Sequence, residues 1–168
     1  GCSGWLRPPH CLEVRVTVPE HQRSIYAMAE PEDRYRMVAT AQQKIPVVKE
    51  LIAKHIGEQI LVIGQYLDQL AELGEALDAP VITGDTPVKE RQRLYELFRT
   101  GGIHLLVVSK VANFSIDLPE ASIAIQVSGS FGSRQEEAQR LGRILRPKAD
   151  GRGARFYTVV VRDTVDAD

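Results

Sequence analysis

The spacing of apolar residues along the chain predicts an α/β fold. Residues 11–18 alternate apolar and polar side chains with a period of two, which is typical of a half-buried strand. Residues 19–43 favour one or two helices that are interrupted near Pro31. From Ile45 to Ile56 the apolar positions recur with a helical period, and Pro46 fits such a helix only near its start or at a kink.

From residue 59 onwards, short apolar runs alternate with helical segments. The runs cover residues 59–64, 79–83, 104–109, 122–127 and 154–161. Helical spacing is found in the leucines between positions 67 and 77, in residues 87–99 and around Gln139. Near-continuous apolar runs indicate strands buried on both faces, so we predict a mostly parallel sheet between layers of helices. Ligands of such sheets bind beyond the carboxyl ends of the strands, where we expect the functional motifs.

The segment QEEAQRLGRILRP, residues 135–147, gathers polar side chains on one face of a predicted helix. At about 100° per residue, Gln139, Arg143 and Arg146 lie within roughly 60° of one another. Gly142 flanks this trio and indicates close approach of a partner, because glycine costs about 0.5–1 kcal/mol inside a helix. A solvated arginine-rich face is the alternative. The opposite side carries an apolar stripe that would hold the helix on a core: Ala138, Leu141, Ile144 and Leu145.

The segment TGDTPVKERQ, residues 83–92, predicts a helix amino end beside Gly84. Asp85 or Thr86 is a suitable N-cap and Pro87 suits the first helical position. The free backbone amides of such an end suit a phosphate. The guanidinium of Arg91 needs a partner, which is either a ligand or an internal carboxylate. Alternatively, the side chain snorkels at the edge of the stripe and its guanidinium reaches water. It lies within an otherwise apolar stripe: Val88, Leu94, Tyr95 and Phe98.

The segment SKVANFSIDLPEAS, residues 109–122, brings three polar groups to the end of an apolar run. Ser109 offers a hydroxyl donor and Lys110 offers charge. Asp117 can hold ribose hydroxyls, as carboxylates at strand ends do in dinucleotide folds, or it can cap a turn. Further along, Ser133 and Glu136 have the spacing of a capping box, which marks the start of the arginine-bearing helix.

The composition is that of an ordinary globular protein, with 168 residues of which 43% are apolar and 26% charged. Because the net charge is −1, any contact with nucleic acid must be local. No apolar run approaches the roughly 20 residues of a membrane span, and no secretory signal is present, so we expect a soluble intracellular protein. Cys2 and Cys11 fit a reducing compartment, and with His10 and His21 they lack the spacing of a metal site.

Two motifs of nucleotide hydrolases are missing. The chain contains neither a GxxxxGK[ST] phosphate loop nor an Asp-Glu pair that could hold magnesium. It therefore offers arginines without the lysine, metal ligands or general base of a complete hydrolase, and we expect its site to be completed elsewhere. The start without methionine and the end in DTVDAD favour an excised piece of a longer protein.

Four segments together resemble the second RecA-like domain of superfamily 2 helicases, and most closely the XPB-type DNA repair helicases in their bacterial and archaeal branch. These segments are residues 61–70, 82–92, 105–122 and 132–148. The resemblance covers about residues 12–163 and is most specific at Gln139, Gly142, Arg143 and Arg146. It implies a P-loop NTPase-like domain without a phosphate loop, and ATP in a cleft between two RecA-like halves. The missing upstream half would hold ATP and Mg²⁺. Arg143 and Arg146 would be arginine fingers, helped by Gln139, while Asp117 would contact the ribose.

The resemblance also implies contacts with the DNA backbone. Gly84 and Ser109 match residues that touch phosphates, contacts that position a strand without reading its bases. Lys110 and Arg91 could add charge, and Gln65 lies in the loop of the first motif. The chain departs from the wider superfamily, and fits the XPB-type branch better, at three positions: Val88, Phe114 and Ser115.

These observations lead to one functional hypothesis with two rivals. Residues 1–11 are predicted to be a linker and residues 12–168 the C-terminal half of an ATP-dependent 3′-to-5′ DNA helicase or translocase of a bacterial or archaeal cytoplasm. The full-length protein would hydrolyse ATP, whereas this piece alone would not. Its partners would be DNA, the upstream half, and a nuclease or a transcription or repair factor. The rivals are a non-catalytic docking platform and an unrelated nucleotide-binding enzyme, which the lack of GxGxxG disfavours.

Overall fold

The computed structural model describes residues 11–110, 118–129, 145–146 and 153–162. Six strands form one sheet in the order β1-β6-β5-β2-β4-β3, and every neighbouring pair is parallel. The predicted parallel sheet is therefore confirmed. Residues 1–10 lie outside the described part, so for them the predicted linker stays a prediction, whereas Cys11, the last residue of that linker, begins the first strand. The strands are β1 Cys11–Val16, β2 Ile60–Gly64, β3 Val81–Ile82, β4 Leu105–Ser109, β5 Ile123–Gln126 and β6 Arg155–Val161.

Five helices fall where the apolar spacing predicts them. Pro31 occupies the first turn of the second helix, which confirms the predicted break. Pro46 lies in the first turn of the third, where its missing N–H costs no helical hydrogen bond. The helices are α1 Glu20–Met28, α2 Pro31–Ala39, α3 Lys44–Lys54, α4 Leu67–Leu77 and α5 Val88–Thr100.

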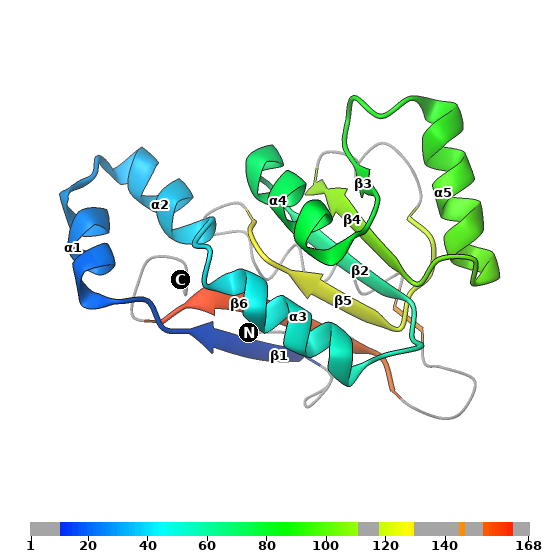
Figure 1. Cartoon of the computed structure of the whole chain (residues 1–168), viewed down its shortest axis with the longest axis horizontal. Helices are drawn as coiled ribbons and strands as arrows, with labels where there is room; N and C mark the ends of the chain where they lie inside the picture. Colours follow the sequence, from blue (N-terminus) through cyan, green and yellow to red (C-terminus); the bar gives the residue numbers. More distant parts are fainter. Residues whose placement is uncertain (1–10, 111–117, 130–144, 147–152, 163–168) are drawn as a thin grey trace.

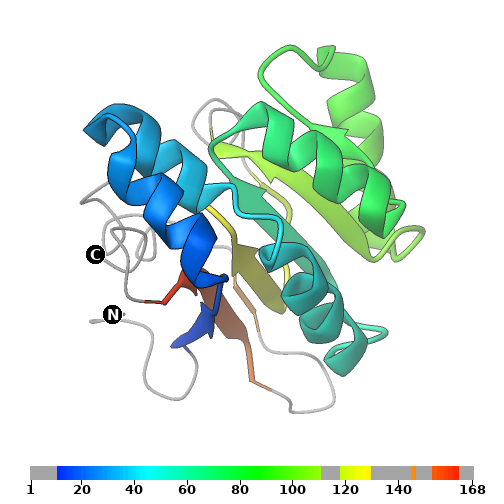
Figure 2. The same ribbon diagram turned by 60° about the vertical axis from the view of Figure 1, so that its left-hand side comes forward.

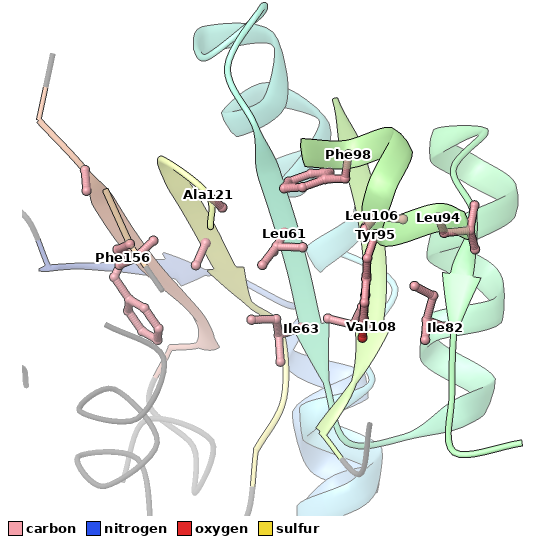
Figure 3. Packing of buried hydrophobic residues seen from close by; sticks show 13 residues of the cluster. Leu61, Ile63, Ile82, Leu94, Tyr95, Phe98, Leu106, Val108, Ala121 and Phe156 are labelled. Atoms are coloured by element: carbon pink, nitrogen blue, oxygen red, sulfur yellow. The ribbon is translucent and has the colours of Figure 1, made fainter. Parts of the chain in front are cut away.

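The helices cover both faces of the sheet (Figure 1). α3 and α4 pack on one face, where Val48 and Leu70 join a core with Val62 of β2. α5 packs on the other face, where Phe98 and Tyr95 meet the opposite side chains of β2 and β4 (Figure 3). Because each central strand is buried on both sides, its residues are apolar without alternation. The pair α1 and α2 lies at one end of the molecule, beyond the carboxyl ends of β1 and β6 (Figure 2).

The start of α5 differs from the prediction. Pro87 precedes the helix as its N-cap residue, and neither Asp85 nor Thr86 caps it. Thr86 Oγ1 instead accepts a hydrogen bond of 2.9 Å from the Thr83 amide and so closes the preceding turn. Val88 is 57% exposed, so the prediction that it belongs to the buried stripe of α5 is wrong.

The parallel sheet has two distinct edges. Gln65 follows β2, Thr83 follows β3 and Ser109 ends β4, so these residues lie at the carboxyl edge. Gln59 and Ser122 precede β2 and β5 and lie at the amino edge. The predicted helix around Gln139 lies outside the described residues. None of the helices in the described part has the length and apolar character that a bilayer crossing requires.

Candidate functional site

Arg146 is fixed by its backbone at the amino edge of the sheet. Its amide donates a hydrogen bond of 2.9 Å to the carbonyl of Ala121, and Leu145 forms a short parallel bridge with the same residue. The Leu145 side chain is 6% exposed and joins the core on the α5 face. The predicted burial of Leu145 and exposure of Arg146 are therefore confirmed, but the prediction that both lie on a helix is wrong, because Leu145 forms a strand-like bridge and Arg146 follows it outside any helix.

The Arg146 side chain reaches solvent. It is 52% exposed, and its Nε lies 3.5 Å from the Glu120 carboxylate, which is 67% exposed. Its Nη1 also donates to the carbonyl of Leu145 at 2.9 Å. An ion pair this long and this exposed contributes at most about 1 kcal/mol. A more strongly charged anion can therefore displace Glu120, and the guanidinium is not locked in an internal ion pair.

A cavity of about 600 Å³ opens beside Arg146. It carries a second guanidinium, that of Arg99, which is half exposed and 3.3 Å from Glu96. Ser122 is 6% exposed, and its hydroxyl has no hydrogen-bond partner within the described part of the chain. Two cationic side chains in a cavity of this size suit an anionic ligand. The lining residues are Gly57, Gln59, Arg99, Leu118, Pro119, Glu120, Ala121, Ser122 and Arg146.

The position of Arg146 at the amino edge of the sheet differs from the expectation that all motifs lie at the carboxyl edge. The chain leaves β5 at its carboxyl end and must enter β6 at its amino end, because the two strands are parallel. Gly129, which follows β5, therefore lies at the carboxyl edge, whereas Arg146 lies at the amino edge beside Ala121. Asp117 directly precedes Leu118, which lines the cavity, but Asp117 itself lies outside the described residues. Gln139 and Arg143 also lie outside them, so the three remain predictions.

The carboxyl edge carries the residues predicted to face DNA. Gly84 is exposed in the turn between β3 and α5. This turn is closed by the Thr83–Thr86 hydrogen bond and by a bond of 3.2 Å from the Asp85 amide to Thr83 Oγ1. The backbone of Gly84 is thus presented to solvent on a braced turn, as a phosphate contact requires.

Ser109 and Lys110 follow each other at the end of β4. Ser109 pairs with Gly64 in the sheet register and is 1% exposed, so its hydroxyl does not reach the surface in this conformation. Lys110 is half-buried. The structure brings these residues to the same edge as Gly84 without forming a continuous exposed cluster.

Arg91 has a partner that the sequence did not predict. It is 6% exposed, and its Nη2 donates a hydrogen bond of 3.0 Å to the backbone carbonyl of Thr86. The guanidinium thus reaches back from α5 to the turn that carries Gly84. Burial leaves it little surface for a direct phosphate contact, whereas its bond to Thr86 holds the turn in place.

The sequence did not predict the residues that hold the backbone of Gln65. Its backbone amide donates to Ser128 Oγ at 2.9 Å, and Ser128 is bonded in turn to the buried Gln69. Gln69 and the buried Lys44 occupy the apolar faces of their helices, four residues before Leu73 and Val48 respectively. A polar residue in an apolar stripe is the signal that could have identified both.

Within the described ranges, no three His, Cys, Asp or Glu side chains come together in a way that could hold a metal ion. The described groups suited to a ligand are therefore the guanidiniums at the amino edge and the turn amides at the carboxyl edge. The first suit a phosphate-bearing small molecule and the second suit a polyanion backbone.

Comparison with known families gives a match over almost the entire chain. The model described as ERCC3/RAD25/XPB C-terminal helicase matches residues 2–167. A Mycobacterium tuberculosis protein named DNA 3′-5′ helicase XPB is 65% identical over 166 residues, which cover 99% of this chain and 30% of the relative. A Saccharomyces cerevisiae relative, named general transcription and DNA repair factor IIH helicase/translocase subunit XPB/SSL2, is 43% identical over 96% of this chain and 20% of its own length. The chain thus spans less than a third of these relatives.

Solved structures support the fold at much lower identity. The E. coli DEAD-box protein SrmB, bound to regulator of ribonuclease activity A, gives a TM-score of 0.64 at 16% identity, over 93% of this chain and 79% of that chain. The yeast DEAD-box splicing factor Prp28 gives 0.63 at 18% identity, over 93% and 30%. These likenesses concern the fold alone, and they confirm the predicted RecA-like arrangement.

Proposed function

The chain belongs to the ERCC3/RAD25/XPB C-terminal helicase family, and from this premise we propose that it is the second RecA-like half of an ATP-dependent 3′-to-5′ DNA helicase or translocase. We place this motor in DNA repair or transcription in a bacterial cytoplasm. The observation that carries the proposal is Arg146, the last arginine of the QRLGRILR motif, which is half exposed and lines a cavity together with a second arginine.

Arg146 and Arg143 act as arginine fingers on the γ-phosphate of an ATP held by the upstream half. A planar guanidinium donates two parallel hydrogen bonds to the phosphoryl oxygens, and it neutralises charge that spreads over them during transfer. Gln139 assists at the same place, and Asp117 contacts the ribose. The exposure of Arg146 and the weakness of its pair with Glu120 support this role, because the side chain can turn to a ligand at little cost.

The upstream half supplies the phosphate loop and the magnesium ligands. When bound there, ATP and Mg²⁺ supply the leaving group and part of the charge neutralisation of phosphoryl transfer. The present chain contributes cationic donors to that site. The cavity beside Arg146 fits this division, because its charged lining is suited to a phosphate.

DNA binds at the opposite, carboxyl edge. Gly84 offers a backbone amide on a braced turn, and Lys110 and Gln65 flank the neighbouring strand ends. Ser109 is buried, so its hydroxyl reaches a phosphate only after a local rearrangement. Arg91 supports the Gly84 turn through Thr86. These contacts hold the strand by its backbone and do not select a sequence.

The two edges belong to one hydrogen-bonded sheet, which relates the nucleotide state to the grip on DNA. Binding of ATP between the halves draws the amino edge towards the upstream half, and hydrolysis releases it. The carboxyl edge moves with the sheet, so the grip on the strand differs between the two states. Such a difference in affinity is what converts the ATP cycle into stepping.

The experiment is a double Arg143→Ala, Arg146→Ala replacement in the full-length protein, with Arg93→Ala as the control. Arg93 is an exposed arginine of α5 that pairs with Glu90, away from the cavity. For the motor we expect DNA-stimulated ATP hydrolysis to fall by about 10³–10⁵ in the double variant and to stay unchanged in the control. Retained hydrolysis together with lost binding of a repair or transcription factor would instead establish the docking platform.

A further inference from the structure

A buried lysine joins the end of α2 to the end of β5. Lys44 is 1% exposed, and its Nζ donates hydrogen bonds of 2.8 Å to the Ala39 carbonyl and 2.7 Å to the Val127 carbonyl. Ala39 is the last residue of α2, so its carbonyl is one that the helix itself leaves without a partner. An ammonium group suits this negative end of the helix dipole.

The same carbonyl begins a chain of hydrogen bonds that leads to the carboxyl edge. Gln69 Nε2 donates to the Ala39 carbonyl at 2.9 Å. Ser128 Oγ donates to Gln69 Oε1 at 2.7 Å and accepts the backbone amide of Gln65 at 2.9 Å. Both side chains are buried, so these bonds form in a medium where an unmade bond is costly.

Gly64 allows this chain to close. A Cβ at position 64 would lie 2.9 Å from Ser128 Oγ and 3.0 Å from Val127 Cγ2. Any larger residue there would push Ser128 away from the amide of Gln65. The hydrogen bond from the Gln65 amide to Ser128 therefore requires glycine at position 64.

We propose that Lys44, Gln69 and Ser128 form a positioning network that fixes the Gln65 loop for contact with the nucleic-acid backbone. This inference rests on the proposed function. None of the three side chains needs to touch DNA, because the network acts through the loop that follows β2. Burial of the lysine ammonium costs desolvation free energy, and an apolar residue could fill the same space without that cost. What the lysine adds is a fixed geometry between α2, α4 and the ends of β2 and β5.

The test uses Ser128→Ala in the full-length protein, with Ser24→Ala as the matched control. Ser24 is an exposed serine of α1 that donates only within its own helix, to the Glu20 carbonyl. We expect the DNA concentration for half-maximal ATPase stimulation to rise about 3- to 10-fold in Ser128→Ala, with kcat at saturating DNA unchanged within about twofold. Ser24→Ala should leave both values unchanged. A fall in kcat without a change in DNA half-saturation contradicts the positioning role.

Gln69→Leu provides a second variant, because it removes the acceptor that orients the Ser128 hydroxyl. We expect it to raise the half-saturating DNA concentration in the same direction, and the double variant to behave like Ser128→Ala alone. Independent, additive effects would mean that the two residues do not act through one network.

Amide hydrogen exchange of Gln65 separates this inference from the proposed function. In Ser128→Ala the Gln65 amide loses its acceptor, so we expect its exchange to be at least tenfold faster than in the wild type. Unchanged exchange overturns the network even if the enzyme is a DNA-stimulated ATPase. Faster exchange in a protein that DNA does not stimulate supports the network and refutes the proposed function.

Discussion

The contact between α4 and β3 allows a quantitative prediction for the replacement Gly74→Ala. A Cβ at position 74 would lie 2.3 Å from Val81 Cγ2 and 3.2 Å from the Ala79 carbonyl. Real side chains do not approach this closely, so the Val81 side chain, α4 or β3 must shift. Gly74 also accepts the Ala79 amide at 2.9 Å, a bond that closes the turn between the two elements. The glycine is therefore required by the close approach of helix and strand.

Two opposing effects set the magnitude. Overpacking of a well-filled core costs about 1–3 kcal/mol. Alanine is favoured over glycine inside a helix by about 1 kcal/mol. The difference between the two effects is a fall of about 0–2 kcal/mol in the free energy of unfolding of Gly74→Ala, which corresponds to a fall of at most roughly 4–8 °C in Tm for a chain of this length.

The assay is urea denaturation of the chain, combined with a double-mutant cycle. Val81→Ala removes the methyl group that Gly74→Ala would meet, so in that background Gly74→Ala should be neutral or stabilising by up to about 1 kcal/mol. If Gly74→Ala stabilises the chain with Val81 in place, helix propensity outweighs the close contact with Val81, and the packing argument is wrong.

Three further predictions use matched pairs of residues. Tyr157→Phe should cost about 1–2 kcal/mol of stability because its hydroxyl is bonded to His55 Nε2 at 2.5 Å, whereas Tyr95→Phe should be neutral or stabilising because its buried hydroxyl has no partner in the described residues. Burial raises the pKa of both phenols, so each contributes stability that is complete below pH about 10 and is lost as the pH rises through the folded-state pKa. Urea denaturation from pH 8 to 11 should therefore show that the free energy of unfolding of Tyr95→Phe falls less steeply with pH than that of the wild type. Lys110→Met should reduce the slope of log DNA affinity against log salt concentration by about 0.7–0.9, whereas Arg91→Met should weaken binding with an unchanged slope, and an equal loss of slope would mean that Arg91 touches a phosphate directly.

The elements that depend on local sequence could be predicted well. Pro31 breaks the helical pattern because it cannot donate a backbone hydrogen bond within a helix, and the structure begins α2 at that residue. The apolar run at residues 60–64 becomes a strand that is fully buried along its length. In both cases the deciding interaction is close in sequence or follows from hydrophobic burial alone.

Contacts between distant segments could not be predicted. The partner of Arg91 is a backbone carbonyl, which no residue type announces, and the Ser128–Gln65 bond joins segments 63 residues apart. The edge at which Arg146 lies follows from the direction of β5 and β6, which requires the sheet order. The chemistry of individual residues was thus readable from the sequence, whereas their positions relative to one another were not.

The most direct test of the arginine-finger proposal is the kcat of the full-length protein with Arg146→Ala, measured at saturating ATP, Mg²⁺ and DNA, together with its affinity for ATP. The upstream half is expected to hold the nucleotide, so we predict that kcat falls by about 10³–10⁵ while ATP affinity changes by less than about tenfold. A kcat within tenfold of the wild type, or a variant that loses ATP binding instead of turnover, would contradict the role proposed for Arg146.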